Sequence, residues 1–157
     1  MRPNQQPVAD AAGDGGAPGK PAVRLATLAV PALDRHIALV RIAAVHVAGS
    51  VGLTVGRVAD IRLALDEACG QFLGAVPPGS PARRRASIEV RFELARGRLR
   101  MTVRGPAPAG WPELGGLGWQ VLSSLVGDLH WTQEGGVGTL VLVEHLPAAD
   151  ELTYLAL

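Results

Sequence analysis

Apolar side chains recur along this chain with two different periods, and the periods separate strands from helices. Alternating apolar residues over 23–30 predict a strand that ends at Pro31. Apolar residues that step by four and three positions predict one helix over 33–49 and a second over about 57–74. The chain therefore begins with one strand and two helices that each have an apolar face to bury.

The second half of the sequence is predicted to form two hairpins around a short helix. The predicted elements are strands over 88–94, 99–103, 129–132 and 139–143 and a helix over 119–128. Because such helices need a sheet face to pack against, the fold class that follows is α/β of the α+β kind. We expect a two-layer sandwich with a mostly antiparallel sheet and helices packed on one face.

The 157 residues are expected to hold one folded domain, because 48% of them are apolar and one core can be built at this length. Residues 1–20 are rich in Pro, Gly and Gln and predict a disordered tail. The domain is expected over 21–147, followed by a C-terminal extension over 148–157. The polar and basic stretch over 79–85 predicts a flexible linker, with contact to an acidic partner as the alternative.

Charge and cysteine content narrow the classes of partner and compartment. Fifteen Lys and Arg against fourteen Asp and Glu give a formal net charge of +1, so no broad attraction to nucleic acid or to a membrane surface is expected. The single cysteine, Cys69, cannot form a disulfide within the chain, and the N-terminus has no secretory apolar region. The histidines show no metal-ligand spacing. We therefore expect a cytoplasmic protein that recognises its partners by a local surface.

Three polar residues of the second predicted helix share one face. Asp60, Glu67 and Gln71 are seven and four positions apart, which places them on one side of a helix. They are either solvated residues of a surface helix or groups that converge on a ligand. Spacing alone favours the first interpretation.

Four segments resemble, in chain order, the motifs of one ATP-binding superfamily. They are residues 60–69, 103–109, 116–122 and 138–142. The first resembles the N-box helix of the GHKL (Bergerat-fold) superfamily, in the branch that contains bacterial anti-sigma serine kinases. The others resemble its V-R-D-x-G-x-G turn, its second glycine box and its closing G-T strand. Each motif alone is weak, but four in register over about 23–146 are similar to the actinobacterial general-stress anti-sigma factors.

The resemblance implies a function and a set of site residues. It implies a homodimeric protein that sequesters an alternative sigma factor and is relieved by an anti-anti-sigma partner of the STAS type. It places Arg41 on a partner-binding face and makes Glu67 the counterpart of the family's general base. The residues that match the ATP site are Gln71, Gly105, Ala107, Gly116, Gly118 and Thr139.

Departures from these motifs predict a degenerate nucleotide site. Gln71 stands where the family has the Asn that holds Mg²⁺, so it is a weak Mg²⁺ candidate. Gly105 replaces the Asp that binds the adenine amino group, and Ala107 and Ala109 replace glycines. The segment over 110–115 is all that remains of the family's lid. ATP and Mg²⁺ binding is therefore expected to be weak or absent.

Alternatives stay open at this point. The leading hypothesis is an anti-sigma factor that needs little or no ATP. The second is an active ATP-dependent serine/threonine kinase that phosphorylates an anti-anti-sigma protein, and the third is a regulator whose partner is not a sigma factor. For single residues, Gly116 and Gly118 are equally typical of a helix start, Thr139 of a strand, and Arg41 of a solvated helix surface.

Overall fold

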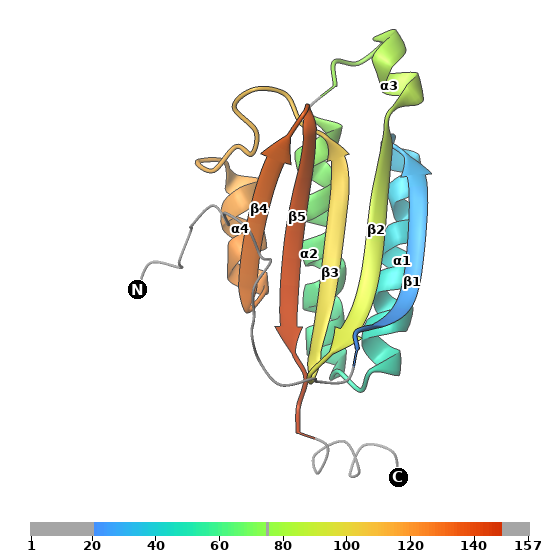
Figure 1. Cartoon of the computed structure of the whole chain (residues 1–157), viewed down its shortest axis with the longest axis vertical. Coiled ribbons are helices and arrows are strands. Elements are labelled where there is room, and N and C mark those ends of the chain that lie inside the picture. The colour runs from blue at the N-terminus through green and yellow to red at the C-terminus, as the bar shows by residue number, and fades with distance from the viewer. Residues whose placement is uncertain (1–20, 75, 149–157) are drawn as a thin grey trace.

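One five-stranded antiparallel sheet organises the computed structural model, which describes residues 21–74 and 76–148 (Figure 1). The elements, in chain order, are β1 (Val23–Pro31), α1 (Asp34–Ser50), α2 (Val55–Leu73), α3 (Pro81–Arg85), β2 (Ser87–Ala95), β3 (Arg98–Pro106), α4 (Leu117–Leu125), β4 (Asp128–Glu134) and β5 (Val137–His145). The strand order is β1-β2-β3-β5-β4. The tail predicted over 1–20 and most of the predicted extension lie outside the described residues.

The helices α1, α2 and α4 lie side by side on one face of this sheet (Figure 1). Alternation along the strands directs Ile88, Val90 and Phe92 of β2 toward these helices, and all three are fully buried. Helix α2 begins at Thr54, whose hydroxyl accepts a hydrogen bond from the Arg57 backbone N–H at 3.3 Å. The predicted two-layer α+β sandwich is confirmed.

On the other face of the sheet, charged residues of opposite sign lie opposite one another. Arg104 of β3 lies directly opposite Glu89 of β2, and Arg100 lies opposite Glu93. Opposite charges at facing positions of neighbouring strands stabilise the pair. Arg100 and Arg104 therefore have acidic neighbours on the sheet itself.

Two elements differ from the sequence prediction. The stretch predicted as a flexible linker contains the short helix α3, where Pro81 fits the first helical position and the Ala86 N–H donates to the Ala82 carbonyl at 2.9 Å. Five residues are too few to show a helical period. Helix α4 begins at Leu117 and ends at Leu125, earlier than predicted, because Asp128 already pairs in β4.

An ion pair between partly exposed Arg57 and buried Glu144 connects α2 to two other elements. Arg57 donates from Nε to Glu144 Oε1 at 2.8 Å and from Nη2 to Glu144 Oε2 at 2.6 Å. Its Nη1 lies 2.7 Å from Asp60 Oδ2, and its Nη2 also donates to the Leu125 carbonyl at 3.1 Å. The hydrogen bond to Glu144 is the main cause that raises the pKa of Arg57. One guanidinium thus connects the start of α2, the end of α4 and strand β5.

We expect Arg57→Met to lower the free energy of unfolding by roughly 2–3 kcal/mol, because it leaves the Glu144 carboxylate buried without its cation. Urea unfolding followed by circular dichroism measures this change. Arg62→Met, at an exposed position of the same helix, is the matched control and should change stability by less than about 0.5 kcal/mol. Equal effects in the two variants would contradict the role of the ion pair.

Candidate functional site

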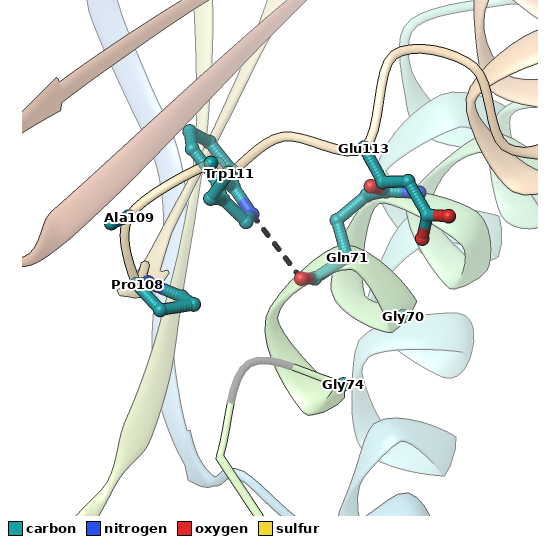
Figure 2. Close-up of a pocket in the computed structure, with 8 residues that line it drawn as sticks. Gly70, Gln71, Gly74, Pro108, Ala109, Trp111 and Glu113 are labelled. Carbon is teal, nitrogen blue, oxygen red and sulfur yellow. Dashed lines mark hydrogen bonds between the residues drawn. The ribbon is translucent and has the colours of Figure 1, made fainter.

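One of the residues predicted to bind a nucleotide, Gln71, lies where the last turn of α2 meets the segment 107–116, which joins β3 to α4. A cavity of about 360 Å³ opens there (Figure 2). It is lined by Gly70, Gln71, Gly74, Pro108, Ala109, Gly110, Trp111 and Glu113. The segment forms one wall of this cavity, whereas the family lid that it replaces would cover a ligand.

Gly105, which matches the family's adenine-binding Asp, has no room for a side chain. A Cβ atom at this position would lie 2.7 Å from Cδ1 and 2.8 Å from Cγ of Phe72, a fully buried residue of α2. Contacts this short do not occur without movement of the ring. The Phe72 ring therefore fills the space that a side chain at position 105 would need.

Trp111 lies inside the site rather than at its rim. Its side chain is 7% exposed, and its ring centroid is 5.0 Å from that of Phe72 with an interplanar angle of 30°. The indole Nε1–H donates to the Gln71 backbone carbonyl at 3.2 Å, the dashed line in Figure 2. The edge of the ring lies against β5, where a Cβ atom on Gly138 would be 2.7 Å from Trp111 Cη2 and Cζ3. The indole thus occupies the space between α2 and the sheet.

The sequence motifs did not identify this role of Trp111, which they placed in the remnant of the lid. Two signals in the sequence are consistent with it. A tryptophan is unusual in a segment of glycine and proline, and a glycine inside a strand, such as Gly138, often marks the close approach of another group.

Two carboxylates lie at the N-terminus of α4, where the second glycine box of the family contacts phosphate. A Cβ atom on Gly118 would lie 3.0 Å from Glu67 Oε2 and 3.3 Å from Gln71 Nε2. A Cβ atom on Gly116 would lie 3.4 Å from Glu113 Cδ. Carboxylates are stabilised at the positive end of a helix, but they repel a phosphate brought to the same place.

Of the three residues predicted to share a polar face of α2, only two lie close together. Glu67 and Gln71 meet at Gly118, whereas Asp60 is held by Arg57 about two turns away. Within the described ranges, no three His, Cys, Asp or Glu side chains form a group that could hold a metal ion. Two aromatic rings, Phe72 and Trp111, lie together between α2 and the sheet, and the carboxylates of Glu67 and Glu113 lie at the N-terminus of α4.

Two further residues that match the family's ATP site, Ala107 and Thr139, do not line the cavity. Thr139 pairs with Arg104 of β3 and Thr132 of β4, so it alternates onto the open face of the sheet, away from the helices. Ala107 is 2% exposed and its N–H donates to the Gly136 carbonyl at 2.8 Å. Ala107 therefore anchors the segment 107–116 to the β4–β5 hairpin, and Thr139 is not brought into the site.

Arg41, the predicted partner-binding residue, lies on the opposite side of α2. Its Nε and Nη2 atoms are 2.7 and 2.6 Å from Asp66 Oδ1, so it links α1 to α2. Cys69 is buried between these helices and the sheet, and this burial raises the pKa of its thiol to about 12. The thiol is therefore protonated at neutral pH, as expected for a small apolar packing group.

Comparisons with known proteins agree with this fold. The family model of the histidine kinase-like ATPase domain matches residues 30–144. The crystal structure of the RsbU and RsbW domains of Rv1364c from Mycobacterium tuberculosis is similar, with a TM-score of 0.60 and 20% identity. The match covers 77% of this chain but only 32% of that chain. Comparison with curated proteins gives no match.

No helix in the described part of the chain is long and apolar enough to cross a membrane. The family model extends from the end of β1 to the end of β5 and includes every element that forms the cavity. The sheet order, the helices on one face and the motif positions on α2, β3, α4 and β5 agree with that match. The chain belongs to the histidine kinase-like ATPase domain family, the GHKL superfamily whose motifs the sequence resembles.

Proposed function

We propose that this chain is a cytoplasmic anti-sigma factor that sequesters a stress or developmental sigma factor by direct contact. An anti-anti-sigma partner of the STAS type would relieve it. Family membership and the anti-sigma character of the segment 60–69 support this proposal. The solved relative also contains an RsbW domain, although this chain spans only 32% of it.

The observation that carries the proposal is an apolar surface on the outside of the helical layer. Leu39, Ile42 and Val45 of α1 are 55%, 66% and 41% exposed, and Leu63 of α2 is 38% exposed. We call Leu39, Ile42 and Val45 the outer α1 stripe. They are three residues apart, so their side chains are neighbours on the helix surface. A helix that buries one face normally presents polar residues on the other, and contiguous exposed apolar residues mark protein contact sites.

Arg41 is the predicted partner-binding residue, and it lies on the same helix as this surface. It lies between Leu39 and Ile42 in sequence, and its side chain remains 40% exposed despite the pair with Asp66. The resemblance assigns Arg41 to partner contact. We infer that the stripe and the exposed edge of Arg41 form one contact surface for the sigma factor, because arginine beside an apolar centre is typical of protein interfaces.

Ile42→Arg is expected to weaken sigma-factor binding at least tenfold, because it places an unpaired charge at the centre of the contact surface. The measurement is retention of each of the host's sigma factors by the immobilised full chain, followed by titration of the one retained. Val55→Arg is the matched control, since Val55 is an 89% exposed apolar residue outside the stripe, at the start of α2.

Two outcomes would contradict the proposal. Retention of no sigma factor by the unchanged chain would defeat the anti-sigma function. We also expect the chain to be a homodimer by light scattering, with the dimer unchanged in Ile42→Arg. Dissociation of the dimer by this substitution would instead assign the outer α1 stripe to contact between two copies.

Nucleotide is expected to be dispensable for this binding. The aromatic ring beside Gly105 and the Glu113 carboxylate at the N-terminus of α4 support weak or absent binding of ATP. Calorimetric titration with Mg·ATP, accompanied by tryptophan fluorescence, is expected to show no saturation at low micromolar concentrations. Saturable binding in that range would contradict the degenerate site.

The alternative function is an ATP-dependent serine/threonine kinase. One observation favours it, since Glu67, the counterpart of the family's general base, is retained and half-buried at the N-terminus of α4. The kinase predicts transfer of the γ-phosphate to a candidate anti-anti-sigma protein and its loss in Glu67→Ala. We expect no transfer by the unchanged chain, and transfer that depends on Glu67 would establish the enzyme.

A further inference from the structure

The indole of Trp111 lies in a space with walls on several sides, which we call the ring slot. Phe72 covers one side of the ring, and Trp131 approaches edge-on with a centroid distance of 6.3 Å and an angle of 87°. Gly138 and Ala107 border the slot on the sheet side, because a Cβ atom on Gly138 would lie 2.7 Å from the indole and 2.8 Å from Ala107 Cβ. The surroundings of the indole are therefore largely apolar.

One hydrogen bond fixes the orientation of the ring in the slot. The Gln71 carbonyl belongs to the last turn of α2, where carbonyl groups lack partners within the helix. The indole Nε1–H of Trp111 supplies one at 3.2 Å (Figure 2). Apolar walls with a single directional polar group are the usual composition of a small-molecule site. The indole makes the contacts that a bound ligand would make.

The backbone around the slot is held by bonds that do not involve the indole. The Ala107 N–H donates to the Gly136 carbonyl at 2.8 Å. Gln133 Nε2 donates to the carbonyls of Ala107 and Pro108 at 2.9 and 2.7 Å. At the other end of the segment, the Gly116 N–H donates to the Glu113 carbonyl at 3.1 Å. Truncation of Trp111 is therefore expected to leave the frame of the slot in place.

A route from solvent to the slot exists as well. Trp111 lines the cavity of about 360 Å³ that opens between the end of α2 and the segment 107–116 (Figure 2). A molecule that enters this cavity reaches the indole without passing through the core. If the indole were absent, the slot and the cavity would form one continuous space.

We propose that Trp111 is a resident ligand of this domain, and that the slot it fills is a latent binding site for fused aromatic rings that carry one ring N–H, of which indole is the simplest. In the unchanged chain the site is closed by its own side chain. This inference goes beyond the proposed function, because it concerns only the slot and holds whether the partner is a sigma factor or another protein.

The test is rescue of Trp111→Ala by free indole, with the full chain and thermal unfolding as the readout. Truncation is expected to lower Tm, and indole at millimolar concentrations is expected to raise it again by several degrees, in a way that grows with the logarithm of the indole concentration. Indole at ten times its dissociation constant raises the ratio of folded to unfolded protein about elevenfold. The unchanged chain should show no such shift, because its slot is full.

Trp131→Ala is the matched control. It removes a half-buried indole of β4 that packs edge-on against Trp111, while Trp111 itself still fills the slot, so indole should not raise the Tm of this variant. Trp111→Phe is the size control, because a phenyl ring keeps the slot mostly filled and should abolish the response to indole. If Trp111→Ala is unfolded alone, folding on addition of indole is the same expected result.

Adenine is the second probe, and it tests whether the slot is apolar. It is expected to give a smaller shift than indole, because several of its nitrogen atoms would be buried without hydrogen-bond partners. A shift from adenine equal to or larger than that from indole would overturn the apolar assignment. No response of Trp111→Ala to indole, or an equal response of Trp131→Ala, would overturn the proposal itself.

Discussion

The stack of Phe72 and Trp111 fills the space between the last turn of α2 and strands β3 and β5, and the neighbouring elements depend on it. On the strand side, contact with these rings leaves no room for a Cβ atom at Gly105 or Gly138. On the helix side, the indole satisfies a carbonyl at the end of α2. The protein's own side chains thus complete the core at this end of α2.

Helix α2 lies between the cavity and the proposed partner surface on α1. Glu67 and Gln71 face α4 and the cavity, whereas Asp66 on another side of the helix holds Arg41 of α1. A nucleotide in the cavity of a related protein could act on α1 through this shared helix. Here the indole of Trp111 already occupies the space between the end of α2 and the sheet, so the proposed partner surface is expected to form without a nucleotide.

The long elements were predictable because each repeats its apolar period several times. Helices α1 and α2 and the strands β2 and β3 belong to this class. Helix α3 is too short and too rich in arginine to show a period. The site was predictable only as a set of departures from motifs. The position of Trp111 was not, because its contacts with Phe72 and Gly138 join residues far apart in sequence, and no local pattern encodes them.

The tight fit of Gly105 against Phe72 also limits which side chains this position tolerates. An aspartate at position 105 would collide with the ring, so this single substitution is expected to damage folding before it can assist ligand recognition. A side chain at position 105 would therefore require a smaller residue at 72, and that change alone opens a void in the core. The two positions are coupled, so the effects of substitutions at 72 and 105 on stability are expected to be non-additive.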